Sequence, residues 1–269
     1  MNNIMFLARL LVLFSLVCIS CAHSSFEQKQ LKHALDFATS NRLELEILLQ
    51  HYTYDSLKLE AAKFLIRNMP HCYSYQQGGE MDSVKRVRTY YSPFGQIDQT
   101  YARRWGHYTY RNLLKIYDAH IITAEYLIDN IDRAFDNWQK RPWNRSLSFE
   151  DFCEYLLPYR IGDEPLEEWR ELYEKKYGYL LDSIYKGGDV VEAANLVSRH
   201  LQEPVFIYCE DFELPHIGPR YLFSHRYGSC VDAADIVTYA FRAVGIPCME
   251  DTDARGGHVW NVVRDTTGR

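Results

Sequence analysis

Two residues near the C-terminus, Cys230 and His258, are of types that perform nucleophilic catalysis together. A cysteine becomes a nucleophile at neutral pH when a nearby base takes its proton. The local pattern places Cys230 at the start of a helix, where unpaired backbone N–H groups can stabilise a thiolate and later an oxyanion. His258 falls in a strand pattern. Taken singly, each residue has a simpler interpretation: Cys230 as an inert buried thiol, and His258 as a core or loop histidine whose hydrogen bonds are satisfied. The two together predict a nucleophile and its base.

The segment that begins at Cys230 has helical periodicity with two faces. Ser229 is suited to cap it, and Gly245 to the left-handed conformation that ends a helix. Apolar positions at helical spacing predict a buried face, made of Ala234, Val237, Phe241 and Val244. The remaining positions predict a polar face, made of Asp232, Asp235, Tyr239 and Arg242.

Downstream of this helix the sequence predicts two short strands. The first covers residues 247–250, a glycine-containing loop covers 253–257, and the second covers 258–264, where apolar and polar residues alternate. Residues 265–268 have the composition of a hairpin turn. Because such a turn expects a partner strand, we expect the natural domain to continue beyond Arg269.

Three motifs in this region together resemble the transglutaminase-like superfamily. They are Gly228-Ser229-Cys230, Arg242-Ala243-Val244-Gly245-Ile246-Pro247 and Gly257-His258-Val259-Trp260-Asn261. The resemblance covers residues 205–269 and implies a papain-like fold with a Cys-His-Asp triad. Cys230 would attack a carbonyl, and His258 would take its proton and later protonate the leaving amine. Residues 151–160 also resemble the multi-domain transglutaminase-like lipoproteins of gut Bacteroidetes.

The third member of the implied triad has no candidate in residues 205–269. In the family an aspartate on the next strand orients the imidazole, and that position would lie beyond Arg269. Asp265 and Asn261 each lie an odd number of residues from His258, so on a regular strand they point to the opposite face. We therefore expect this chain, as given, to show little turnover.

No metal or cofactor site is predicted. Four residues are of types that bind zinc: Cys209, His216, His225 and Cys230. Their spacings of seven, nine and five residues differ from the short paired spacings of structural zinc sites. The sequence has no phosphate-binding loop or dinucleotide fingerprint. Acidic pairs such as Glu167-Glu168 are interpreted as solvated helix faces rather than as glycosidase acids.

The first 21 residues predict a lipoprotein signal peptide. Arg9 precedes an apolar run at residues 10–17, which is too short to span a bilayer of about 30 Å. The run leads to Ser20 and Cys21, and a small residue before a cysteine resembles a bacterial lipoprotein signal. That resemblance implies lipidation of Cys21, membrane anchoring and a cell-envelope location, periplasmic or on the surface. Ordinary secretion and an uncleaved anchor are the alternatives.

Upstream of residue 205 most of the chain has helical periodicity. Helices are expected over 26–69 (with a second helix from Asp55 or Ser56), over 111–137 and over 190–201, and shorter ones from Ser148 and from Glu164. The predicted organisation is a signal peptide (1–21), a helical domain (22–140), a helical connecting region (141–204) and a transglutaminase-like core (205–269) that is incomplete at its C-terminus. The predicted fold class is α+β, mainly helical before a partial papain-like core.

Composition restricts the function classes. A formal net charge of −6 argues against non-specific nucleic-acid binding, which depends on a basic surface. The tyrosine-rich residues 90–110 suit an aromatic platform for sugar or peptide, or, as we prefer, a packing segment.

Three functions stay open. The first and expected one is a cell-envelope enzyme that hydrolyses or transfers amide bonds of peptide or protein substrates through a cysteine acyl-enzyme, with hydrolysis favoured. The second is a catalytically inactive lipoprotein that binds peptide or glycan. The third is a scaffold lipoprotein in which Cys230 is incidental.

Overall fold

The computed structural model describes residues 25–79, 81–82, 85, 110–203, 206–208, 214–265 and 267. Within these residues the protein is α+β and mainly helical, as the sequence predicts. The predicted signal peptide with Cys21, most of the tyrosine-rich segment, and Cys209 lie outside the described residues. Of the helices in the described part of the chain, none is long and apolar enough to cross a membrane.

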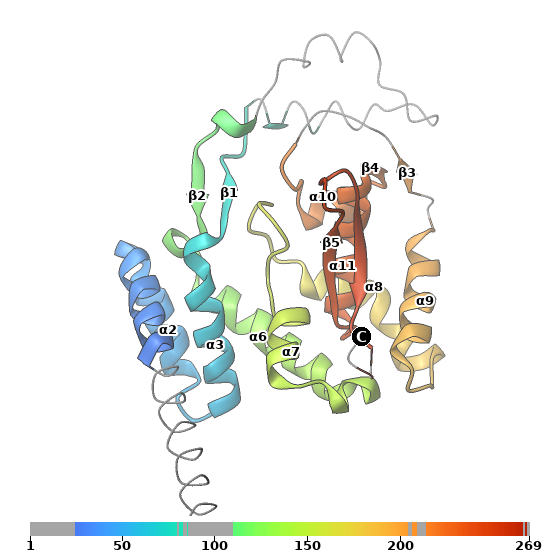
Figure 1. Ribbon diagram of the computed structural model, residues 1–269, viewed down its shortest axis with the longest axis horizontal. Coiled ribbons are helices and arrows are strands. Elements are labelled where there is room, and N and C mark those ends of the chain that lie inside the picture. The colour runs from blue at the N-terminus through green and yellow to red at the C-terminus, as the bar shows by residue number, and fades with distance from the viewer. Residues whose placement is uncertain are drawn as a thin grey trace, which may run out of the picture.

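The N-terminal half builds one hydrophobic core from helices (Figure 1). Residues 25–37 are helical. They are followed by η1 (Thr39–Asn41), α2 (Arg42–His51), α3 (Ser56–Asn68) and η2 (Met69–His71), and later by α6 (Ala124–Lys140), η5 (Pro142–Ser146) and α7 (Phe149–Tyr155). As predicted, Asp55 caps α3, accepting a hydrogen bond from the backbone N–H of Lys58. The largest fully buried side chains of this core include Leu45, Ile66, Leu127, Phe135 and Phe152.

The helix predicted over residues 111–137 begins only at Ala124, so the prediction for 111–123 is wrong. That stretch forms η3 (Tyr110–Asn112), β2 (Lys115–Tyr117) and η4 (Asp118–His120). The strand β2 pairs antiparallel with β1 (Tyr73–Tyr75), far upstream in the chain. Pairing with a distant segment satisfies the backbone groups of residues 115–117, and this overrides their local helical pattern.

The C-terminal half packs a second core around one central helix (Figure 1). Its helices are α8 (Arg170–Tyr179) with its π-helical continuation η6 (Leu180–Ile184), α9 (Val190–Leu201), α10 (Pro219–Ser224) and the central α11 (Cys230–Ala243). The short strands β3 (Ile207–Tyr208) and β4 (Tyr227–Gly228) pair in parallel. The strands β5 (Cys248–Thr252) and β6 (Val259–Val263) form an antiparallel hairpin in which Glu250 is opposite Asn261.

The start of α8 also differs from the prediction, which placed it at Glu164. The carboxylate of Glu164 accepts hydrogen bonds from the backbone N–H groups of Ile161 and Gly162, both at 2.7 Å. These bonds hold residues 161–164 in a loop, and the helix begins at Arg170. The loop matters for the site because it lies against the residues that precede α10.

The polar face predicted for α11 is not exposed to solvent. Its four residues, Asp232, Asp235, Tyr239 and Arg242, are all buried, and Asp235 is 0% exposed. The reason is the position of α11, which packs against α8, α9, α10 and the β5–β6 hairpin and so has no face left for solvent. Each polar side chain therefore needs a partner within the protein. Arg242, for example, donates to the backbone carbonyls of Cys248 and Arg160.

The C-terminal end of α11 is held by side chains from η5 and from Arg141, which precedes it. Trp143 Nε1 and Asn144 Nδ2 each donate to the carbonyl of Gly245 at 2.9 Å, and Arg141 Nε donates to the carbonyl of Val244 at 2.8 Å. Gly245 has a φ of +81°, which confirms the predicted left-handed end of the helix. These bonds satisfy the carbonyls that a helix end leaves unpaired and join the two halves of the protein.

Candidate functional site

Cys230 is the first residue of α11, where the sequence predicted it. The turn before it depends on two residues of the Gly-Ser-Cys motif. The backbone N–H and the hydroxyl of Ser229 donate to Asp232 Oδ2 at 2.8 and 3.1 Å. A Cβ atom at Gly228 would lie 2.3 Å from that same carboxylate oxygen, so only glycine allows this close approach. The motif thus builds the helix start that presents the thiol.

Among the described cysteines, Cys230 is half-exposed, whereas Cys248 and Cys153 are buried. Burial raises the pKa of Cys248 and of Cys153 to about 12, and it raises the pKa of Cys72 to about 11. Those three thiols stay protonated at neutral pH and behave as apolar packing groups. All four cysteines in the described residues are free thiols.

His258 immediately precedes β6 and is exposed. Its ring lies 6.1 Å from that of Trp260, which is also exposed. Asn261 points the other way, because its amide donates to the carbonyl of Ala234 and to Thr238 Oγ1 in α11. His258 and Asn261 therefore point to opposite sides of the hairpin, as their odd separation in the sequence predicts. Among the described residues, no hydrogen bond joins His258 to Cys230.

One cleft nevertheless extends between the neighbours of both residues. It has a volume of about 370 Å³ and is lined by Val231 of α11, Thr252 and Val259 of the hairpin, and also by Ile161, His216, Arg242, Met249, Glu250 and Asp251. The hairpin folds back along α11, so the connection between β5 and β6 lies near the Cys230 end of the helix. The topology thus brings His258 near the N-terminal end of α11, where Cys230 lies. The side chains of His258 and Cys230 are not hydrogen-bonded to each other there.

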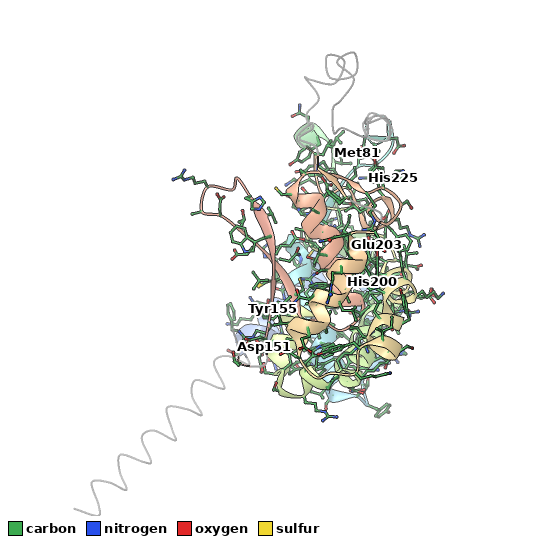
Figure 2. All side chains as sticks on the ribbon, turned by 90° about the vertical axis from the view of Figure 1, so that its right-hand side faces the viewer. Met81, Asp151, Tyr155, His200, Glu203 and His225 are labelled. Carbon is green, nitrogen blue, oxygen red and sulfur yellow. The ribbon has the colours of Figure 1, made fainter. Side chains whose placement is uncertain are left out.

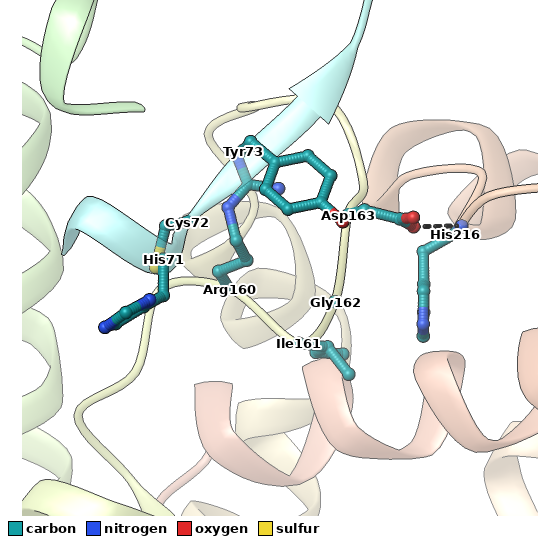
Figure 3. Close-up of a pocket in the computed structure, with 8 residues that line it drawn as sticks. All are labelled: His71, Cys72, Tyr73, Arg160, Ile161, Gly162, Asp163 and His216. Carbon is teal, nitrogen blue, oxygen red and sulfur yellow. Dashed lines mark hydrogen bonds between the residues drawn. The ribbon is translucent and has the colours of Figure 1, made fainter. Parts of the chain in front are cut away.

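A second group of chemically capable side chains lies in this cleft and was not predicted. His216 Nδ1 lies 2.9 and 3.0 Å from the two carboxylate oxygens of Asp235, and its backbone N–H donates to Asp163. Figure 3 shows the imidazole directed from the loop before α10 towards α11, beside Gly162. Glu250 of β5 completes the group, which we call the His216 cluster: His216, Asp235 and Glu250, whose ligand-type atoms lie within 4.8 Å of one another.

The charges of the His216 cluster are coupled. Burial alone would lower the pKa of His216, but the charge and the hydrogen bond of Asp235 raise it to about 10. Burial, followed by the negative charge of Asp235, raises the pKa of Glu250 to about 8. Burial also raises the pKa of Asp235, against the opposing charge of His216. An imidazole that stays protonated at neutral pH cannot act as a base there, so His216 does not replace His258 in that role.

Of the four residues considered for zinc, Cys209 lies outside the described residues, and the other three have different neighbours. His216 is joined to Asp235 rather than to a cysteine. His225 stacks on Tyr221, with ring centroids 4.2 Å apart. Sequence reasoning missed Asp235 because helical periodicity assigned it to solvent, and no local motif links residues 216, 235 and 250.

The chain was compared with protein-family models, with curated proteins and with solved structures, and no match was found in any of the three comparisons.

Proposed function

We propose that this protein is a cysteine-dependent amide hydrolase or acyl transferase of the transglutaminase-like type, acting on peptide or protein substrates. Cys230 is the nucleophile and His258 its base. The observation that carries the proposal is the shared cleft, because Val231 and Val259, the neighbours of the two residues, line it from opposite elements. The cell-envelope location, with Cys21 lipidated, is part of the same proposal and rests on the sequence.

The first turn of α11 suits this chemistry. Its backbone N–H groups have no partners within the helix, and they are the groups that can stabilise an oxyanion next to Cys230. The side chain of Cys230 is half-exposed, so a carbonyl can approach it. The order of helix, strand, glycine-containing loop and strand also supports the implied papain-like core.

The proposal requires His258 to turn towards α11. Catalytic hydrogen bonds in ligand-free proteins are often long or poorly aligned, and they tighten when the substrate binds. The loop that carries His258 contains Gly256, whose φ is +68°, and Gly257. A Cβ at Gly256 would meet no atom within 4 Å, so the loop is not packed against the body there. Figure 2 shows this end of the hairpin projecting away from the helices.

The test is alkylation of Cys230 by a small thiol reagent, followed site by site by mass spectrometry. Reaction faster than at the buried Cys153 and Cys248 is expected from exposure alone and does not discriminate. The discriminating variant is His258→Ala, which we expect to slow alkylation of Cys230 about tenfold or more, in line with the contribution of a positioned base. His200→Ala is the matched control, because His200 is a half-buried histidine on α9 whose ring bonds to the carbonyl of Leu196 in its own helix.

The His258→Ala variant must first be shown to be folded by circular dichroism. If Cys230 is then alkylated at the same rate in this variant as in the wild type, His258 is not the base. The second candidate, a binding protein without chemistry, would then be favoured if peptide or glycan binding survived Cys230→Ala. The observation in its favour is that His258 and Trp260 form an exposed pair of rings at the start of β6.

A further inference from the structure

Three segments that are distant in the sequence bring the residues of the His216 cluster together. His216 comes from the loop before α10, Asp235 from the middle of α11, and Glu250 from β5. Asp235 is fully buried, and the side chain of His216 is 24% exposed. Glu250 is held by a further contact, accepting a hydrogen bond from Thr238 Oγ1 at 3.0 Å. The three donors are therefore fixed by the fold rather than gathered on a flexible surface.

The cluster contains two carboxyl groups and one imidazole. Two carboxylates face a single imidazole, and among the described residues no lysine or arginine forms an ion pair with Asp235 or Glu250. Glu164 and Asp232 add further negative charge nearby, since both raise the pKa of Asp235. Buried like charges are unfavourable unless a cation or a proton balances them. A divalent cation bound here would balance the charge of these carboxylates.

A fully buried hydroxyl without a partner lies beside this position. Tyr239 follows Asp235 by one helical turn on α11, it is 0% exposed, and its Oη has no hydrogen-bond partner in the described part of the chain. Burial raises the pKa of Tyr239, and the charges of Glu164 and Asp235 raise it further. Buried polar groups are nearly always satisfied by protein, water or a ligand.

We propose that His216, Asp235 and Glu250 bind a divalent transition-metal ion, which we assign as zinc. One imidazole nitrogen and two carboxylate oxygens are ligands that zinc accepts. Tetrahedral zinc with bonds of about 2.0–2.1 Å separates its ligand atoms by about 3.4 Å. His216 and Asp235 already lie closer than that, and the whole set lies within 4.8 Å, so a shift of about 1 Å completes the geometry.

A bound zinc would keep one position open to the cleft. His216 and Glu250 line the 370 Å³ cleft directly, so a water molecule or a ligand group can reach the metal from there. The ion would also join β5 to α11 and to the loop before α10, which fixes the hairpin on the helix. This inference does not depend on Cys230, and its test uses a different readout from that of the proposed function.

The experiment measures zinc bound to the untagged, chelator-treated chain, by elemental analysis after dialysis and by the rise in thermal midpoint with added zinc. We expect one zinc per chain and a midpoint that rises with zinc concentration, since a ligand that binds only the folded state stabilises it. Glu250→Gln and His216→Asn are expected to weaken binding at least tenfold. Asp251→Asn, the exposed next residue of β5, and His200→Asn are the matched controls, expected to bind as the wild type does.

Two results would overturn the inference. One is zinc binding by Glu250→Gln that equals the wild type. The other is zinc that is lost when the cysteines are alkylated but kept by both cluster variants, which would assign the metal to thiols. Glu250→Gln keeps an acceptor for Thr238 and removes a like charge, so its metal-free fold is expected to be intact by circular dichroism. Zinc retained by Cys230→Ala separates this site from the proposed nucleophile.

Discussion

Gly162→Ala is expected to displace His216 by adding a single methyl group. A Cβ atom at residue 162 would lie 2.3 Å from both Cδ2 and Nε2 of the imidazole. Ordinary carbon contacts are about 3.5 Å or more, so the ring must move by about 1 Å. A displacement of this size distorts the hydrogen bond between His216 Nδ1 and Asp235, now 2.9 Å long. The backbone of Gly162 has no left-handed φ, so the effect comes from this contact alone.

The expected loss of stability follows from the two interactions involved. A hydrogen bond to a charged group contributes about 1.5–3 kcal/mol, and overpacking adds about 1–3 kcal/mol. Alanine also restricts the unfolded chain more than glycine does, and this offsets about 0.4–1 kcal/mol of the loss. We expect Gly162→Ala to lower the free energy of unfolding by about 2–4 kcal/mol, measured by urea denaturation.

Gly188→Ala is the matched control, because a Cβ at that position meets no atom within 4 Å and its φ is not positive. We expect that variant to be unchanged or slightly more stable. If Gly162→Ala unfolds at the same urea concentration as Gly188→Ala, the imidazole does not occupy the position next to Gly162, and the His216 cluster is not formed as described.

Three further outcomes are expected. Gly245→Ala should lower the free energy of unfolding by about 3 kcal/mol, because the φ of Gly245 is +81° and a Cβ there would lie 2.8 Å from the carbonyl oxygen of Asn137. Urea denaturation measures this change, and a loss below about 1 kcal/mol would contradict the prediction. Burial raises the pKa of Asp182, but hydrogen bonds and charges of Lys140 and Arg141 outweigh it and hold that pKa below 3.8. A depressed carboxylate pKa contributes stability above the unfolded value that is lost as the pH falls, so the advantage of wild type over Asp182→Asn in thermal midpoint should disappear below pH 3.8 and not at higher pH. Tyr239→Phe in metal-free protein removes an unpartnered buried hydroxyl, so stability should stay equal or rise by up to about 1 kcal/mol; a clear loss would show that the hydroxyl has a partner.

The local elements around the candidate site could be predicted from the sequence because their signals are local. Ser229 and Gly245 mark the two ends of α11, and the alternation after residue 257 marks β6. A cap, a left-handed glycine and a strand period of two each act within a few residues. The placement of Cys230 at a helix start needed nothing more.

The buried partners could not be predicted because they depend on contacts between distant segments. Asp235 has a solvent-facing position by helical periodicity, and it is buried only because His216 and Glu250 come to it from other elements. The same limit explains β2, whose pairing with β1 replaces a locally plausible helix. Periodicity reports which positions share a face, but it does not report whether a second layer covers that face.

The contacts of the hairpin bear on how much His258 has to move. At its base, Arg264 pairs with Asp151 at 3.1 Å and lies over the ring of Tyr155, and Figure 2 shows these two residues of α7 beside the hairpin. At its middle, Glu250 and Asn261 bond to Thr238 of α11. Both sets of contacts lie before residue 252 or after residue 259. The proposed closure of His258 onto Cys230 would therefore leave these contacts in place, but it would have to break the hydrogen bonds that the His258 carbonyl accepts from the backbone N–H of Asp253 and from Thr252 Oγ1, at 3.1 and 3.0 Å.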